Sequence, residues 1–229
     1  SQPGEALKNN VLGTALLARL ASEHDVEQFV LISSDKAVNP TNVMGATKRM
    51  AELVVQGVAS QFPGTQYVSV RFGNVLGSSG SVVPLWWKMI EEGRPPRVTD
   101  PRMARYFITH REAADFLLHV AGIQGAGWSV FLPMTGEPVR ILDLAQRMIA
   151  AAGARLDVEV TGLRPGEKLN EALAYASEDT QPITQHAIGA RVEREVVILE
   201  TLIEAARAGD AGRTLDELHR IVPQFGAQP

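Results

Sequence analysis

The sequence of 229 residues contains no cysteine, so disulfide bonds and thiolate metal sites are excluded. This composition fits a reducing compartment, and we expect a cytoplasmic protein. The five histidines form no HxxxH or HExxH pair, which argues against a metal site. There is neither a signal peptide nor a run of about 18 apolar residues, so we expect no contact of this segment with a membrane.

The sequence also lacks an excess of positive charge and a glycine-rich phosphate-binding loop. The net charge of −4 argues against nucleic acid as a partner. An anionic small substrate would therefore have to be held by a few local arginines. The sequence also lacks a GxGxxG loop, which normally opens a dinucleotide-binding domain.

Helices and buried strands alternate in the first third of the chain. Apolar residues recur at helical spacing over residues 5–23, and the pattern predicts a second helix over residues 44–60. Short apolar runs at residues 28–34 and 66–72 predict strands buried on both faces of a parallel sheet. Alternation of this kind favours βαβ units in a doubly wound α/β sheet, with these two strands as neighbours.

The pattern changes after Gly73, where a Gly- and Ser-rich loop begins. We interpret residues 1–75 as a partial NAD(P)-binding Rossmann-like domain and residues 76–229 as mainly a substrate-binding domain, interleaved with the sheet. In this second part we expect strands at 129–132 and 158–161, and helices near 82–92, 112–120, 141–151, 193–208 and 214–221.

A hydroxyl, a carboxylate and an amine stand together directly after the first predicted strand, as Ser34, Asp35 and Lys36. Ligands bind at the carboxyl ends of strands in open α/β sheets. A group that holds a proton beside one that accepts it is what general acid–base catalysis requires. Taken locally, an ordinary exposed turn at a strand end is the more common interpretation, because such tripeptides are frequent.

A wider resemblance rests on five motifs in one order. The chain resembles, over nearly its whole length, the large nucleotide-sugar dehydratases related to UDP-N-acetylglucosamine 4,6-dehydratase, which belong to the extended short-chain dehydrogenases and serve capsule and glycan synthesis. The resemblance implies the C-terminal part of a Rossmann-like doubly wound parallel sheet with a smaller α/β substrate-binding domain. The motifs are Asn10-Val11-Leu12-Gly13-Thr14, residues 33–49, 71–78, 100–107 and 162–168.

The reaction implied by this resemblance is a dehydration with no net redox change. A hydride leaves carbon 4 of the sugar for the nicotinamide, water is eliminated across carbons 5 and 6, and the hydride returns to carbon 6. By analogy with the family, Asp35 protonates the departing hydroxyl, Lys36 is the base at carbon 5, and Ser34 hydrogen-bonds the oxygen on carbon 4.

Met44 departs from the short-chain dehydrogenase pattern, in which a tyrosine stands four residues before the lysine, here Lys48. A thioether cannot take a proton, so Asp35 or an ordered water is a candidate base for oxidation at carbon 4. The large dehydratases also have methionine here; the alternative is plain helix core. The resemblance assigns Lys48, with Ser33 and Phe72, to the cofactor, NAD or NADP.

The resemblance also supplies a set of residues for the UDP-sugar substrate. Arg105 and Arg164 suit bidentate contact with a diphosphate. As isolated residues, these would more often be turn residues or surface charges. We expect the arginines and Asn74 to converge on one cleft. The whole set is Asn74, Ser81, Arg105, Arg164 and Glu167.

The chain opens at Ser1, already in helical sequence, and we interpret it as a segment of a longer protein. The family places its GxGxxG loop and, in large members, inner-membrane helices upstream, so we expect this segment alone to be inactive. Whether the protein forms a homo-oligomer remains open. Two other functions also remain open: an epimerase or reductase of nucleotide sugars on the same fold, and a non-catalytic UDP-sugar-binding or assembly module.

Overall fold

The computed structural model describes residues 3–123, 125, 130–191 and 200–226. The chain divides into two compact units. The first, here called the sheet unit, comprises Ser1–Phe72, Phe116–Met134 and Ala172–Pro229, and the second unit comprises Gly73–Asp115 and Thr135–Glu171. Two later segments of the chain thus belong to the sheet unit.

The sheet unit is built on a five-stranded sheet. Strands β1 (Gln28–Ser34), β2 (Gln66–Phe72) and β7 (Val130–Pro133) are parallel, and β1 pairs with β2 along its whole length. The predicted neighbouring strands are therefore confirmed. Two antiparallel strands that the apolar pattern did not predict, β11 (Ala187–Arg191) and β10 (Asp179–Pro182), complete the order β1-β2-β7-β11-β10.

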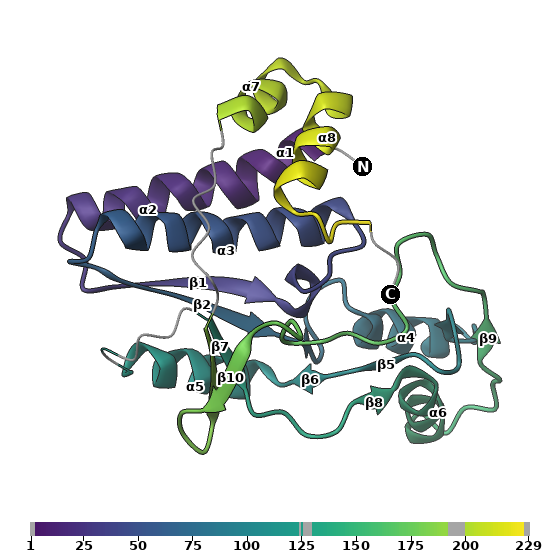
Figure 1. Cartoon of the computed structure of the whole chain (residues 1–229). Coiled ribbons are helices and arrows are strands. Elements are labelled where there is room, and N and C mark those ends of the chain that lie inside the picture. Colours follow the sequence, from purple (N-terminus) through teal and green to yellow (C-terminus); the bar gives the residue numbers. More distant parts are fainter. Residues whose placement is uncertain (1–2, 124, 126–129, 192–199, 227–229) are drawn as a thin grey trace. The chain divides into compact units, whose positions relative to one another are not determined.

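Helices cover both faces of this sheet. Helix α1 (Pro3–Leu7), a π-helical turn (Lys8–Leu12) and α2 (Gly13–Glu23) follow without a break, and α2 and α3 (Val43–Gln61) lie over one face, with α5 (His110–Ala121) at the other (Figure 1). This layering is that of a Rossmann-like α/β fold.

The two predicted strands differ in their burial. Strand β2 is buried from Tyr67 onward, as a central strand should be. In β1, Leu31 is buried but the side chain of Ile32 is 51% exposed. The expectation that β1 is buried on both faces is therefore wrong, because β1 stands at the edge of the sheet and its second face is only partly covered.

The sheet unit ends in a helical hairpin of α7 (Glu200–Ala208) and α8 (Ala211–Ile221). Its apolar side packs on α1 and α3 in a core that includes Leu7, Val11, Met50, Leu202 and Leu218. The beginning of the helix predicted near 193–208, like residue 129 of the predicted strand, lies outside the described residues. No helix in the described part of the chain is long and apolar enough to cross a membrane.

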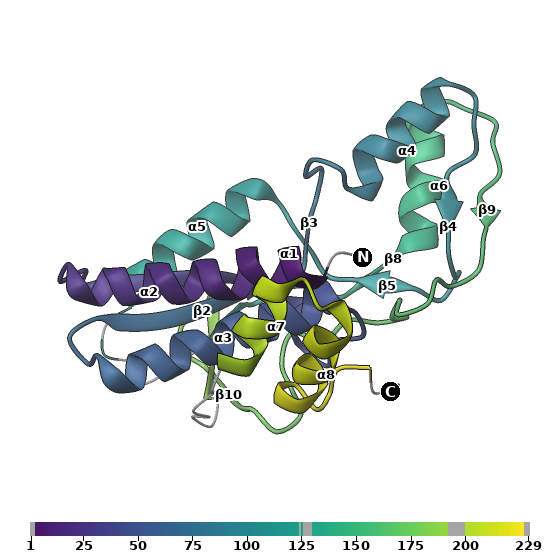
Figure 2. The same ribbon diagram turned by 90° about the horizontal axis from the view of Figure 1, so that it is seen from above.

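The second unit contains two helices and three short strand pairs. Helices α4 (Val82–Glu91) and α6 (Ile141–Ala151) lie side by side around the buried Trp86 (Figure 2). A Cβ atom at Gly73 would lie 2.6 Å from the Tyr106 carbonyl oxygen, so glycine permits the first strand pair to close. The pairs are β3 (Asn74–Val75) with β6 (Phe107–Ile108), β4 (Arg97–Val98) with β9 (Glu159–Val160), and β5 (Ala104–Arg105) with β8 (Val139–Arg140).

Candidate functional site

The predicted acid–base group lies at the carboxyl end of β1. Asp35 begins a 3-10 turn, Asp35–Ala37, and both neighbours donate to the same oxygen of its carboxylate. The Ser34 hydroxyl donates to Asp35 Oδ1 at 2.9 Å, and Lys36 Nζ donates to Oδ1 at 2.9 Å. The structure therefore brings the three predicted residues into direct contact.

The two charges of this group differ in exposure. The Asp35 side chain is fully buried, whereas the Lys36 side chain is 32% exposed. The second carboxylate oxygen, Asp35 Oδ2, is buried and has no hydrogen-bond partner in the described part of the chain. A buried acceptor without a partner is energetically unfavourable, so this oxygen is a natural place for a proton or for a donor from a ligand.

Helix α3 holds the turn closely from one side. The helix is capped by Asn42, whose Oδ1 accepts from Gly45 N at 2.9 Å. A Cβ atom at Gly45 would lie 2.3 Å from the Lys36 carbonyl oxygen, so only glycine lets the helix pass this close. Sequence reasoning did not assign Gly45 a role. Its signal was a glycine inside a predicted helix, where glycine normally destabilises.

Met44 and Lys48 lie one turn apart on α3. Met44 is 41% exposed, so the alternative interpretation of this residue as helix core is wrong. Lys48 Nζ donates to the Ile32 carbonyl oxygen at 3.4 Å, next to the end of β1. Its amine is thus placed near the candidate acid–base group.

The three residues assigned to the cofactor have different surroundings. The Ser33 hydroxyl donates to Glu52 Oε1 at 2.5 Å, and the buried Phe72 ring packs against Phe116 with 6.0 Å between ring centroids. Both side chains are thus occupied within the sheet unit. Lys48 is the one of the three whose position suits a cofactor ribose, so the residues present fit a nicotinamide cofactor in part.

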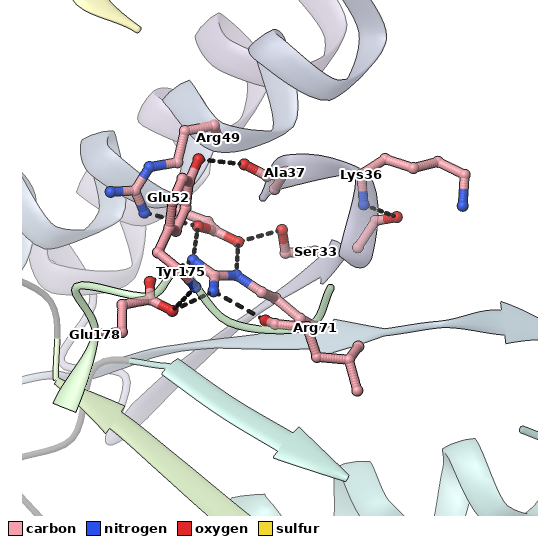
Figure 3. Close-up of polar contacts among 10 residues, drawn as sticks. Ser33, Lys36, Ala37, Arg49, Glu52, Arg71, Tyr175 and Glu178 are labelled. Carbon is pink, nitrogen blue, oxygen red and sulfur yellow. Dashed lines mark hydrogen bonds and ion pairs between the residues drawn. The ribbon is translucent and has the colours of Figure 1, made fainter. Parts of the chain in front are cut away.

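A buried charge cluster lies beneath the turn and was not predicted. Arg71 on β2, entirely buried, donates to Glu52 Oε2 at 2.7 Å and to Glu178 Oε2 at 2.7 Å (Figure 3). Arg49 donates to Glu52 Oε2 at 3.1 Å and lies over the Tyr175 ring. The two positive charges of the cluster are therefore balanced by the two negative charges of Glu52 and Glu178. The signal available in the sequence was an arginine inside an apolar strand.

Ionisation within this cluster is governed by its pairing. Burial opposes the charge on Glu52, but Arg71 and Arg49 outweigh it and hold the Glu52 pKa below its usual value. Burial also opposes the charge on Arg71, and its two carboxylate partners nevertheless raise the Arg71 pKa above its usual value. Burial raises the pKa of the Tyr175 phenol, which is therefore a hydrogen-bond donor at neutral pH.

In the second unit, Arg105 is tied to backbone carbonyls. Its Nη1 donates to the Ala104 and Leu169 oxygens at 2.8 and 2.7 Å, and Nη2 donates to the Lys168 oxygen at 2.6 Å. Among the described residues, Arg105 forms no salt bridge, so its positive charge is not neutralised by a carboxylate.

The other predicted substrate residues come from separate segments of the second unit. Arg164 is exposed, and the Glu167 carboxylate accepts from the Arg164 amide at 3.1 Å, just before the carbonyls that hold Arg105. The backbone N–H of Asn74 donates to the carbonyl oxygen of Tyr106, the residue after Arg105, at 2.8 Å. Ser81 caps α4 without a side-chain hydrogen bond, and its buried hydroxyl has no partner in the described part of the chain.

The family model for polysaccharide biosynthesis proteins matches residues 1–192. The chain belongs to this family. The polysaccharide biosynthesis family member "Capsular polysaccharide biosynthesis protein CapD" of Staphylococcus aureus is 50% identical to it over 179 residues, which cover 77% of this chain and 30% of that protein.

Other relatives carry the names of two reactions. A UDP-N-acetylglucosamine 4,6-dehydratase (inverting) of Campylobacter jejuni is 34% identical over 182 residues, covering 78% of this chain and 52% of the relative. A UDP-glucose 4-epimerase of Rickettsia typhi is 33% identical over 180 residues, covering 77% and 52%. This chain, of 229 residues, thus spans between about a third and a half of the length of these relatives.

A solved structure supports the same fold. The X-ray structure of Pen from Bacillus thuringiensis has a TM-score of 0.74 and 31% identity to this family member, covering 81% of this chain and 59% of that one. The fold is therefore that of the Rossmann-like nucleotide-sugar dehydratases and epimerases, as the motifs predicted.

Proposed function

We propose that this chain supplies the acid–base and UDP-sugar-binding residues of a nucleotide-sugar 4,6-dehydratase that acts on a UDP-N-acetylhexosamine. The observation that carries the proposal is the contact of Ser34, Asp35 and Lys36 at the carboxyl end of β1. Epimerisation at carbon 4 needs no acid for a leaving hydroxyl. An elimination needs both an acid and a base beside neighbouring carbons, and this pair provides them.

The hydrogen bond between Lys36 Nζ and Asp35 Oδ1, 2.9 Å long, gives the pair a direct path for one proton. With the proton on Asp35, the neutral Lys36 amine can take the hydrogen from carbon 5. Asp35 then gives its proton to the hydroxyl leaving carbon 6, and the pair ends as the ion pair seen in the structure. One proton is taken up and one released, so the elimination is balanced without a further base.

A bound nicotinamide would accept the hydride from carbon 4, while the proton of the carbon 4 hydroxyl would pass to an ordered water. When the hydride returns to carbon 6, Lys36 would give its proton to carbon 5, and the pair would then regain one proton from solvent. For the hydride transfer Lys48 would hold the cofactor ribose, and Ser34 would bind the oxygen on carbon 4. In the second unit, the unneutralised charge of Arg105 and the exposed side chain of Arg164 would bind the diphosphate of the substrate. Asn74, Ser81 and Glu167 would contact the sugar and the uridine ribose.

The reaction is tested on the full-length protein with UDP-N-acetylglucosamine and NAD. Mass spectrometry is expected to show loss of one water from the sugar, and in deuterated water one deuterium at carbon 5. Lys36→Met should abolish both signals, because the stem stays but the base is removed. Full dehydration by Lys36→Met would show that the base is another group.

Asp35→Asn separates the acid from the base. It keeps the size of the side chain but removes the transferable proton, so water loss should stop while deuterium exchange at carbon 5 survives better than in Lys36→Met. Lys8→Met is the matched control, since Lys8 is an exposed lysine of the same unit and pairs with the exposed Glu5. Inversion at carbon 4 with no loss of water would instead favour the epimerase.

Substrate binding is tested with Arg164→Ala. Losing one charge-assisted contact should weaken UDP binding by about 1.5–3 kcal/mol and leave NAD binding nearly unchanged. Arg155→Ala, another exposed arginine of the second unit, is the control. Isothermal titration calorimetry measures both ligands, and an equal loss of both would contradict the assignment of Arg164 to the diphosphate.

A further inference from the structure

The acid–base turn is held by a second contact from a distant part of the chain. The Tyr175 hydroxyl donates to the carbonyl oxygen of Ala37, the last residue of the Asp35–Ala37 turn, at 2.7 Å (Figure 3). Both residues are buried, so water does not compete for this hydrogen bond. The contact joins positions 138 residues apart.

Tyr175 is itself fixed by the buried charge cluster. Its amide donates to Glu178 Oε2 at 2.9 Å, and Glu178 N donates to the Tyr175 carbonyl oxygen at 3.1 Å, closing the turn Tyr175–Glu178. Arg71 binds this turn through Glu178 and through the Leu173 carbonyl oxygen at 3.1 Å. The Tyr175 ring also lies under the Arg49 guanidinium, 4.8 Å from its centroid.

The opposite end of the acid–base segment is attached to the same cluster. Ser33, just before Ser34, donates to Glu52 Oε1, which also accepts from Arg71 Nε at 2.8 Å. Residues 33 and 37 are therefore both anchored to one charge-balanced unit, while Gly45 brings α3 against Lys36 from above. The three residues between the anchors are those to which we assign chemistry.

We propose that Tyr175 is a positioning residue, which fixes the Asp35–Ala37 turn and so sets the geometry of the acid–base pair. The proposal rests on the proposed function, because Tyr175 acts through Asp35 and Lys36 and does not touch the substrate. Displacements of about 1 Å in catalytic groups can lower rates by about a hundredfold. Loss of the Tyr175 hydroxyl should therefore lower kcat and leave KM nearly unchanged.

The test compares Tyr175→Phe with Tyr67→Phe in the full-length protein. Tyr67 is an exact chemical match: its buried hydroxyl donates to the Ala18 carbonyl oxygen at 2.7 Å in the same unit, away from the turn. Each variant removes one hydroxyl and keeps the ring. Hydrogen–deuterium exchange of the amides of residues 35–38 reports on the turn, because Val38 N donates to the Asp35 oxygen within it.

Tyr175→Phe should speed exchange at residues 35–38 and lower kcat for water loss roughly 10- to 100-fold, with KM for the UDP-sugar changed less than about twofold. Tyr67→Phe should leave all three unchanged. Equal exchange at residues 35–38 in both variants would overturn the proposal, as would a loss confined to KM. Hydrogen–deuterium exchange is measured without turnover, so it tests the turn contact separately from the reaction. If Tyr175→Phe speeds exchange at residues 35–38 but the wild-type protein does not dehydrate the UDP-sugar, the proposed function is refuted and the turn contact stands.

Discussion

Two buried arginines, one in each unit, satisfy their guanidinium groups in opposite ways. Arg71 in the sheet unit donates to two carboxylates, which neutralise its charge together with that of Arg49. Arg105 in the second unit donates to three backbone carbonyls and keeps its full positive charge among the described residues. Burial of an arginine thus does not by itself indicate a structural or a binding role.

The chemistry of the partners distinguishes the two roles. Carboxylates cancel the charge, so the role of the Arg71 cluster is structural: it joins α3, β2 and the Tyr175–Glu178 turn to one another and holds both ends of the acid–base segment. Carbonyl dipoles hold the side chain in place and leave its field available to an anion. We therefore expect variants of Arg71 to lower stability most and variants of Arg105 to lower affinity for anionic ligands most.

The largest effect is expected for Arg71→Leu. It leaves two buried carboxylates without their shared partner, and breaking a buried pair from one side costs about 3–5 kcal/mol. Urea unfolding followed by circular dichroism measures the loss. UDP affinity of the folded fraction should stay within about twofold, and a loss of stability below ~1 kcal/mol would show that Glu52 and Glu178 can be accommodated without Arg71.

Glu52→Gln should give the next largest effect, about 2–3 kcal/mol at neutral pH, since it removes charge-assisted hydrogen bonds from Arg71 and Arg49. The Glu52 pKa is lower in the folded protein than its usual value of 4.5, so its stabilising contribution is complete above pH 4.5. The contribution is lost as pH falls through the folded pKa. The difference between wild type and variant should therefore shrink below about pH 4.5. A difference that stays constant with pH would contradict this account.

The sequence predicted the strands and helices that carry a strong apolar pattern, and β2 and α6 have the predicted bounds. It did not predict β10, in which all four residues are exposed and polar or proline, because its place depends on pairing with β11. Ser34, Asp35 and Lys36 were predicted because chain neighbours at a strand end remain neighbours in space.

The residues that support them were not predicted, for a physical reason. Glu52, Arg71, Tyr175 and Glu178 come from one helix, one strand and one distant turn, and no short-range pattern relates them. Ser33 illustrates the same limit. The family resemblance assigned it to the cofactor, and alternation along β1 turns its side chain to the face of Glu52 and α3.

Arg105→Gln tests the second buried arginine, which we expect to bind an anion. Its amide can still donate to a carbonyl, so stability should fall by only about 1 kcal/mol, whereas the lost charge should weaken UDP binding at least about tenfold, or ~1.4 kcal/mol. Calorimetric titration with UDP gives the affinity, and urea unfolding gives the stability. Unchanged UDP affinity, with a large loss of stability, would place Arg105 in the same structural class as Arg71.

The smallest effect is expected for an arginine that is neither buried nor assigned to a ligand. Arg97 Nε donates to Glu159 Oε2 at 2.9 Å between β4 and β9, with side chains 63% and 43% exposed. Water and salt screen such a pair, so Arg97→Gln should cost about 0–1 kcal/mol and leave UDP affinity unchanged. Repeating the urea unfolding at high salt should remove even this difference. If Arg97→Gln instead cost as much as Arg71→Leu, burial and charge pairing would not account for the ranking of the arginines, and the short strand pair itself would have to control unfolding.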